Sequence, residues 1–157
     1  MVNQDGSSNI KITTSHFQLI GNEATDLLNE LKSFKIGEDK MGRIEMVGLK
    51  EVEITSAEQF YALKEEAAKN RATSSTFKND TSSRSHAVCR IRLQNIFFKS
   101  MEPGELLIID LAGSENTADS QFHDRALQKQ TKEINKSLMS LKECIRNRSL
   151  QAMNPSR

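Results

Sequence analysis

The sequence predicts a single α/β domain, and three observations support that fold class. First, 157 residues is the length of one ordinary domain. Second, short stretches rich in Ile, Thr, Val and Phe alternate with segments whose apolar residues recur at helical spacing. Third, residues 106–112 form a continuous apolar run, which is typical of a strand buried on both faces of an α/β sheet. We therefore expect a mostly β sheet with flanking helices.

The composition excludes several classes of protein. Lys and Arg total 22 and Asp and Glu total 21, so the chain is neither a polycation nor an acidic tail. It holds no apolar run near the ~18 residues that a membrane span needs. The polar segment 1–10 lacks an apolar signal, which argues against secretion. Cys89 and Cys144 are too few for a disulfide scaffold and lack the spacing of metal ligands.

The first part of the chain is expected to form a strand followed by smaller elements. We expect residues 1–10 to be a flexible arm and residues 11–157 to be the domain. The stretch 11–20 is rich in Ile, Thr and Phe and predicts a strand. A short helical turn is expected at 24–31. Glycines then separate three short strands, which we place at residues 34–36, 43–47 and 52–54.

A helix is predicted to begin after Ser56, because Gln59 follows three residues later as in a capping box. Apolar residues recur at helical spacing as far as Ala67, and the helix should end near residues 70–71. The next stretch, 72–85, is small and polar, so we expect a loop.

The second part alternates two strands with a long helix. Residues 89–93 alternate apolar and polar side chains and predict a strand with one wet face, which carries Arg90 and Arg92. A turn at 102–105 leads into the apolar strand 106–112, and a polar loop is expected at 116–130. The final helix should run from Lys132 to Asn147, with an apolar stripe formed by Ile134, Leu138, Leu141 and Ile145.

Asp110 and Gly113 form the first constellation that can carry chemistry. The apolar strand delivers Asp110 at its carboxyl end, which is where ligands bind in open α/β sheets. A carboxylate there can hold Mg²⁺ through water, and a glycine three residues later lets a backbone N–H approach a phosphate closely. Taken alone, the pattern also fits an ordinary strand end followed by a turn.

The second constellation is the segment 79–86, directly before a predicted strand. Its hydroxyls can ligate Mg²⁺ and position water, and Arg84 can pair with Glu115 in the facing loop. An ordinary polar loop is the alternative, but the order Ser-Ser-Arg-Ser-His is unusual enough to disfavour it.

The third constellation is a basic face on the final helix. Between Leu127 and Arg148 there are six basic and two acidic residues, a net charge of +4. The remainder of the chain carries 16 basic against 19 acidic residues, a net charge of −3, so positive charge is concentrated here. A solvated face is the plain interpretation. Such a face also suits an acidic polymer, either nucleic acid or an acidic protein surface.

These three segments, in this order and spacing, resemble the kinesin motor domain. Residues 79–86 resemble its switch I, of the form Asn-x-x-Ser-Ser-Arg-Ser-His. Residues 110–115 resemble switch II, and residues 134–138 resemble the start of the relay helix that meets the microtubule. Asn70-Arg71 is similar to the end of the preceding helix, where the family keeps an Arg near the nucleotide.

The resemblance covers roughly residues 14–148 and implies a partial kinesin-type P-loop NTPase fold that lacks the phosphate-loop strand and helix. The stretch 142–144 and the loop length between Glu115 and Ile134 are similar to the microtubule-depolymerising, internal-motor class. A phosphate loop of the form Gly-x-x-x-x-Gly-Lys is absent from the sequence. The family places that loop upstream of the segment that this chain covers.

The resemblance also implies roles for individual residues. Ser82 and Ser83 would contact Mg²⁺ and the attacking water, while Asp110 would hold the metal through water. Gly113 would sense the γ-phosphate, and Arg84 would bridge to Glu115 to close the two switches. The nucleotide-binding set would be Arg71, Asn79, Ser82, Ser83, Asp110 and Gly113. The microtubule-binding set would be Lys132, Lys136, Lys142 and Arg146. ATP would order the switches, and hydrolysis would release them and shift the helix.

Three positions depart from the family pattern. Gln130 stands where the family usually has Glu, and Asn116 stands where an Arg usually follows the switch II Glu. Both departures bear on communication between the switches. Gly21 replaces a usual aromatic residue, which bears on packing more than on chemistry.

The sequence thus favours part of a kinesin-like motor whose parent couples ATP hydrolysis to microtubule movement or depolymerisation. Its cofactors would be ATP and Mg²⁺. Its partner would be the microtubule, and no membrane association is expected. Its location would be the cytoplasm and the cytoskeleton, including the spindle. The alternative is a microtubule-binding module without ATP turnover. Few aromatic residues argue against nucleic-acid binding. Without the phosphate loop, we expect no ATPase from this chain alone, and we expect an exposed apolar edge at residues 106–112 with poor stability. The oligomeric state stays open.

Overall fold

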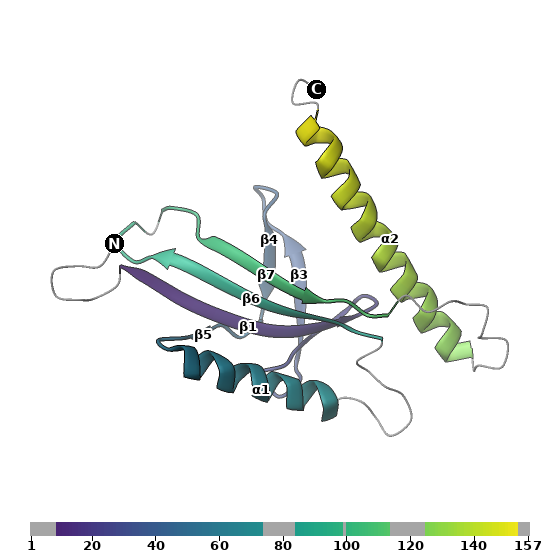
Figure 1. The fold of residues 1–157 in the computed structure, drawn as a ribbon, viewed down its shortest axis with the longest axis horizontal. Helices are drawn as coiled ribbons and strands as arrows, with labels where there is room; N and C mark the ends of the chain where they lie inside the picture. Colours follow the sequence, from purple (N-terminus) through teal and green to yellow (C-terminus); the bar gives the residue numbers. More distant parts are fainter. Residues whose placement is uncertain (1–8, 74–83, 99, 114–124, 154–157) are drawn as a thin grey trace.

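The computed structural model describes residues 9–73, 84–98, 100–113 and 125–153. Two helices and seven strands alternate along these segments (Figure 1). In chain order they are β1 (Ile10–Ile20), β2 (Glu23–Asp26), β3 (Ser33–Glu38), β4 (Ile44–Val47), β5 (Val52–Glu53), α1 (Ala57–Thr73), β6 (His86–Asn95), β7 (Gly104–Asp110) and α2 (Arg125–Met153). The α/β class expected from the sequence is confirmed.

The strands form one sheet in the order β4-β3-β2-β1-β6-β7, with β5 also paired to β1. Every pairing among the described strands is antiparallel. β1 and β6 pair over nearly their whole lengths, from Ile10 opposite Asn95 to Leu19 opposite His86. β7 continues this ladder, with Ala87 opposite Asp110. This register brings the start of β6 and the end of β7 to the same end of the sheet.

Two apolar clusters hold the sheet together. In the first, the ring of Phe17 on β1 meets that of Phe34 on β3 edge-on at 5.3 Å, and Ala24 and Val88 complete the cluster. In the second, Ala67 of α1 packs against Leu27 and Leu28, which follow β2. Figure 1 shows α1 lying along β1. The core therefore sits around β1, with residues 14–18 of that strand buried on both faces.

The predicted start of α1 is confirmed with one difference in detail. The backbone N–H of Gln59 donates to the Ser56 hydroxyl oxygen at 3.2 Å, as a capping box requires. The Gln59 side chain accepts from the backbone N–H of Thr55 at 3.0 Å, one residue before the cap. The first bond satisfies an N–H group that the first helical turn leaves without a partner, and the second ties the residue before the cap to the helix.

The helical turn expected at 24–31 is wrong, because residues 23–26 form strand β2. Asp26 is fully buried, and its carboxylate accepts the N–H of Leu28 at 2.8 Å and that of Lys50 at 2.7 Å. These bonds fold residues 27–31 into a turn in which Glu30 and Leu31 adopt positive φ angles of 53° and 58°. A buried carboxylate, which the sequence pattern does not identify, thus overrides the local propensity for helix.

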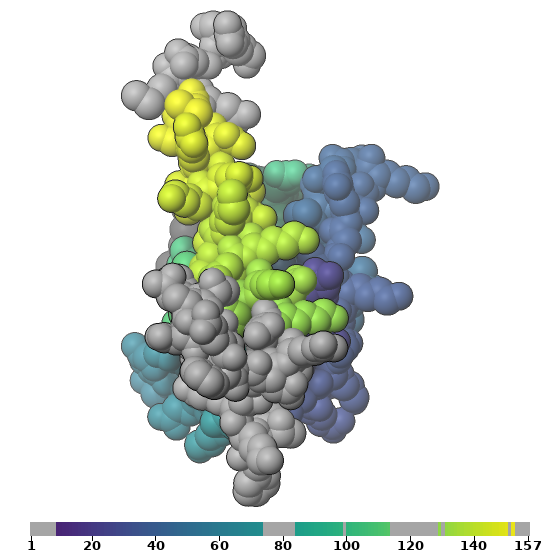
Figure 2. Space-filling view, turned by 90° about the vertical axis from the view of Figure 1, so that its right-hand side faces the viewer, coloured from purple at the N-terminus to yellow at the C-terminus, as the bar shows by residue number. Residues whose placement is uncertain are grey.

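The final helix is longer than predicted at both ends. α2 begins at Arg125, inside the stretch expected to be a loop, and continues to Met153. Residues 125–131 and 148–153 contain no Gly or Pro and are mostly good helix formers, so helical propensity explains the extension. The apolar stripe is buried only at its start, because Ile134 is 7% exposed and Ile145 is 62% exposed. Figures 1 and 2 show the C-terminal half of α2 projecting away from the sheet.

Burial of β6 and β7 also differs from the simplest expectation. The strand β7 has the sequence of a strand buried on both faces, yet each of its residues is exposed, because it pairs only with β6 in the described sheet. The expected exposed apolar edge is therefore present. Conversely, Arg90 belongs to the predicted wet face of β6 but is buried, because it pairs with Glu105 at 2.5 Å and Glu51 at 3.4 Å.

Within the described segments, neither helix is both long enough and apolar enough to cross a membrane.

Candidate functional site

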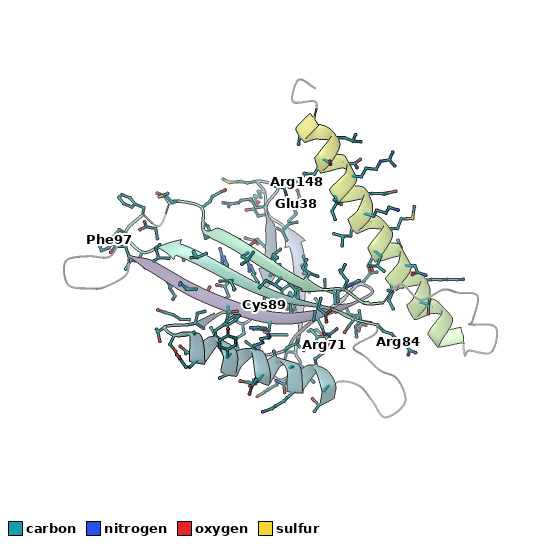
Figure 3. The ribbon with its side chains drawn as sticks, in the orientation of Figure 1. Glu38, Arg71, Arg84, Cys89, Phe97 and Arg148 are labelled. Atoms are coloured by element: carbon teal, nitrogen blue, oxygen red, sulfur yellow. The ribbon has the colours of Figure 1, made fainter. Side chains whose placement is uncertain are left out.

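Four elements meet at the end of the sheet where β6 begins and β7 ends. They are the C-terminal turn of α1, the first residues of β6, the last residues of β7 and the first half of α2. Figure 3 shows Arg71 reaching from the end of α1 toward the strand ends. The antiparallel register of β1, β6 and β7 is what collects these residues, since they lie far apart in the sequence.

Arg71 binds the ends of both strands. Its Nη1 donates to the Asp110 carboxylate at 2.7 Å, and its Nη2 donates to the Ser85 carbonyl at 2.9 Å. Its Nε also donates to the Ser85 hydroxyl at 3.3 Å. The guanidinium is mostly covered while the carboxylate is 72% exposed. Arg71 therefore orients the Asp110 carboxylate from one side, and the other side of the carboxylate is exposed to solvent.

The position of Arg71 follows from its neighbours on α1. The Asn70 side chain donates to the Leu27 carbonyl at 2.7 Å, which ties the end of the helix to the turn after β2. The Thr73 hydroxyl donates to the Asn70 carbonyl at 2.9 Å and satisfies an acceptor at the helix end. The last turn of α1 is thus anchored on both sides of the arginine.

His86 connects the other three elements. Its Nδ1 accepts the backbone N–H of Ala112, just beyond β7, at 3.1 Å. Its Nε2 lies 2.8 Å from the hydroxyl oxygen of Ser137 on α2. That hydroxyl donates to the Ile134 carbonyl at 2.7 Å. Partial burial and the nearby Arg71 lower the pKa of His86 below its usual value, and Asp110 opposes part of that shift.

Arg84 lies two residues before β6 and is half-buried. Figure 3 shows it near the start of that strand. Its Nη1 is buried and has no hydrogen-bond partner within the described segments. Its predicted partner Glu115 lies outside the described residues. So do Asn79, Ser82, Ser83 and Asn116, so the predicted switch I ligands are not placed. Gly113 is described and exposed, three residues after Asp110.

The predicted basic face is exposed along α2. Lys132 and Lys136 lie on the half of the helix that packs near the sheet, and Lys142 and Arg146 lie on the half that projects from it. Figure 2 looks onto α2, with the blue atoms of β3 and β4 to its right. A cationic surface of this length is open to a large partner.

A cavity of about 560 Å³ opens between α1 and the sheet, next to the Arg71–Asp110 pair. Its apolar lining includes Phe60, Ala67, Val88 and Ile108, and Ile108 comes from the edge strand β7. Together with the exposed residues of β7, this lining places apolar side chains along the edge of the sheet.

His16 and Cys89 also border this cavity. The His16 Nε2 lies 3.3 Å from the Thr14 hydroxyl and 3.9 Å from the Cys89 sulfur. Burial is the main cause that lowers the pKa of His16, and the charge of Lys64 lowers it further, while Asp26 opposes part of this shift. Burial also raises the pKa of Cys89. Among the described residues, no group of three or more His, Cys, Asp or Glu side chains could hold a metal ion.

With this geometry in place, comparison with known proteins identifies the family. The family model of the kinesin motor domain matches residues 1–155. The chain belongs to the kinesin motor domain family. Its fold is part of the kinesin-type P-loop NTPase fold, and a solved structure of kinesin 6 shares it with a TM-score of 0.74 and 25% identity, over 97% of this chain and 44% of that chain. A fast kinesin gives a TM-score of 0.65 and 28% identity, over 83% and 38% of the two chains.

Curated relatives point to the same family. The diatom spindle kinesin-1 of Cylindrotheca fusiformis is 37% identical over 89% of this chain and 22% of its own length. The kinesin-like protein KIN-13B of Arabidopsis thaliana is 36% identical over 87% of this chain and 21% of its own length. Human KIF24 is 38% identical over 84% of this chain and 10% of its own length. The chain therefore spans no more than about a fifth of these relatives.

The described residues do not by themselves form a complete site for Mg²⁺ and ATP. One carboxylate oxygen of Asp110 is engaged by Arg71, and the 157 residues contain no Gly-Lys pair of a phosphate loop. The described part of the site is a junction of strand ends and helices and not a phosphate cradle.

Sequence reasoning placed Arg71, Asp110 and Gly113 in one site, and the structure brings the first two into contact. It missed Ser85, His86 and Ser137 as individual contributors. All three lie inside the quoted motifs, so the motifs themselves were the available signal. Their pairing depended on a sheet register that no motif specifies.

Proposed function

We propose that this chain is the carboxyl-side portion of a kinesin motor, and that its parent protein couples ATP hydrolysis to movement on, or shortening of, microtubules. The junction of Arg71, Ser85, His86, Asp110 and Ser137 carries this proposal. Ser85, His86, Asp110 and Ser137 come from the three segments that resemble switch I, switch II and the relay helix. Arg71, at the end of α1, contacts Ser85 and Asp110, and His86 contacts Ser137. A junction of this kind can transmit a displacement at the strand ends to α2.

The exposed edge of β7 supports a longer parent. The four consecutive apolar residues 106–109 are between 44% and 53% exposed, and the cavity beside them is lined mainly by apolar side chains. We propose that the phosphate-loop strand and its helix cover this edge and fill the cavity. Arg84 and Glu115 would then close the two switches over the nucleotide, with Ser82 and Ser83 facing the metal.

The experiment for the parent protein is substitution at the strand end. Asp110→Asn should reduce microtubule-stimulated ATP turnover at least about 100-fold, because it removes the carboxylate charge that the metal and Arg71 both need. Arg84→Ala should have a similar effect through loss of switch closure. Glu65→Gln, on the exposed surface of α1, is the matched control and should leave turnover unchanged. Normal turnover in Asp110→Asn would contradict the proposal.

The proposed partner surface is the basic face of α2, formed by Lys132, Lys136, Lys142 and Arg146. Such a face suits an acidic protein surface, and we propose that tubulin supplies that surface. Replacing Lys136, Lys142 and Arg146 together by Ala should weaken co-sedimentation of the chain with microtubules at least about tenfold. Lys69→Ala on α1 is the control. Equal sedimentation of the triple variant and the control would remove this surface from the proposal.

A second candidate is a microtubule-binding module that does not turn over ATP. The absence of a phosphate loop from the 157 residues favours it for the chain acting alone. Equilibrium binding of Mg-ATP to the purified chain tests this second candidate. We expect no saturable binding by the chain alone, and saturable binding would contradict the view that the upstream segment is needed. Cytoskeletal location and the resemblance of residues 142–144 to the depolymerising class are parts of the same proposal.

A further inference from the structure

The imidazole of His86, at the start of β6, contacts both the backbone that follows β7 and the helix α2. One ring nitrogen faces the backbone of Ala112 and the other faces the Ser137 hydroxyl, at 3.1 Å and 2.8 Å. The ring is partly buried, and Ile134 beside Ser137 is 7% exposed, so both contacts lie where α2 meets the sheet.

Hydrogen-bond accounting assigns a single tautomer to this ring. The Ala112 N–H can only donate, so Nδ1 of His86 must be unprotonated. The Ser137 hydroxyl has one proton, which it donates to the Ile134 carbonyl at 2.7 Å, so Nε2 must carry the ring proton and donate to Ser137. The two requirements come from different elements and agree. His86 is therefore neutral, with its proton on Nε2.

The geometry points to His86 as a positioning residue that couples the backbone after β7 to the orientation of α2. The Ala112 amide immediately precedes Gly113, so any movement of that turn lengthens or breaks the bond to Nδ1. A ring that loses this bond is free to rotate, and its hold on Ser137 weakens with it. A connection of this coupling to phosphate sensing rests on the function proposed above, in which Gly113 senses the γ-phosphate. The coupling of Ala112 to α2 does not depend on that function.

Two conservative variants separate the halves of this link. Asn places its side-chain oxygen two bonds from Cβ, as Nδ1 is placed, so His86→Asn keeps an acceptor for Ala112 and loses Ser137. Gln places its nitrogen three bonds from Cβ, as Nε2 is placed, so His86→Gln keeps a donor for Ser137 and loses Ala112. A side chain that only fills space would make the two variants behave alike.

The test uses the whole 157-residue chain without nucleotide or microtubules. Amide hydrogen exchange is followed by NMR at Ala112, with the amides of Phe17 and Val88 in the central ladder as the folding reference. The mobility of a nitroxide on the exposed Cys144 of α2 is measured in a Cys89→Ser background. The ¹⁵N shifts of His86 report its tautomer directly.

We expect His86→Gln to speed exchange at Ala112 about fivefold and to change the mobility of the α2 label less than His86→Asn does. His86→Asn should free the label on α2 and speed exchange at Ala112 less than His86→Gln does, because it keeps an acceptor for that amide. Ser137 does not contact Ala112. Ser137→Ala should nevertheless raise hydrogen exchange at Ala112 about threefold when His86 is present, and it should have no effect on that exchange in the His86→Gln background. An Nδ1-protonated ring, equal behaviour of the two His86 variants, or no response of Ala112 to Ser137→Ala would each overturn the proposal. None of these results depends on ATPase activity or on microtubule binding, so the proposed function can fail independently.

Discussion

The two parts of this molecule carry similar apolar patterns and bury them very differently. The covered part consists of β1, β2, β3 and α1, whose apolar residues form two packed clusters. The uncovered part consists of β7 and the segment of α2 after Leu141, whose apolar residues stay exposed. Polar contacts of Arg71 and His86 lie at the border between them. Apolar sequence in the covered part therefore marks the folding core, whereas in the uncovered part it lies at the surface, where we propose that other protein segments cover it.

The largest expected effect tests the core of the covered part. Phe17 is 2% exposed and packs against Phe34, so Phe17→Ala should reduce the free energy of unfolding by about 3–5 kcal/mol. Leu107→Ala on the edge strand is the matched control and should change it by no more than ~0.5 kcal/mol. Urea unfolding followed by circular dichroism measures both. Similar losses in the two variants would abolish the distinction between the two parts.

A smaller effect is expected where α2 passes from covered to uncovered. Ile134 and Ile145 lie on the same apolar stripe, but they are 7% and 62% exposed. Ile134→Ala should cost about 2 kcal/mol of unfolding free energy, and Ile145→Ala should cost less than ~0.5 kcal/mol. The same unfolding assay applies. A large loss from Ile145→Ala would mean that the outer half of α2 packs against the chain in solution.

The third prediction concerns the cap of α1. Ser56→Ala removes the acceptor of the Gln59 N–H and should cost about 1 kcal/mol of unfolding free energy. Ser140→Ala replaces an exposed serine inside α2, where Ala has the higher helix propensity, so it should be neutral or stabilise by up to ~0.5 kcal/mol. Opposite signs in the two helices are the expected result. A neutral Ser56→Ala would show that the Thr55–Gln59 bond is a sufficient cap.

Sequence reasoning located the strands well because β-branched residues and glycines separate them clearly. It misplaced residues 24–26, since the buried carboxylate of Asp26 bonds to Lys50, 24 positions away. The predicted bounds of α2 are too short because the polar residues 125–131 suggest a loop, whereas their helix propensity favours helix. Within the site, the motifs identified Arg71 and Asp110, but their contact spans 39 positions and that of His86 with Ser137 spans 51. Such pairs depend on strand register and helix docking, which act at a longer range than any motif.

The smallest expected effect is a dependence of stability on pH in the window just below about 6.5. The pKa of His16, in the covered part, and that of His86, at the border, both lie below the usual 6.5 in the folded protein. The unfolded chain therefore binds more protons in this window, so the free energy of unfolding should decrease as the pH falls through it. Carboxylates with lowered pKa values, such as Asp39 and Glu58, act below this window because their usual values are 3.8 and 4.5.

Single variants divide this dependence between the two parts of the molecule. His16 is 5% exposed and His86 is more open, so His16→Gln should remove the larger share of the slope and His86→Gln the smaller. Urea unfolding at several pH values in this window provides the measurement. A stability that rises on acidification would contradict the neutral histidines at both places. Equal shares would show that His86, although it lies at the border, is as firmly enclosed as the core histidine, and α2 would then belong to the covered part over more of its length.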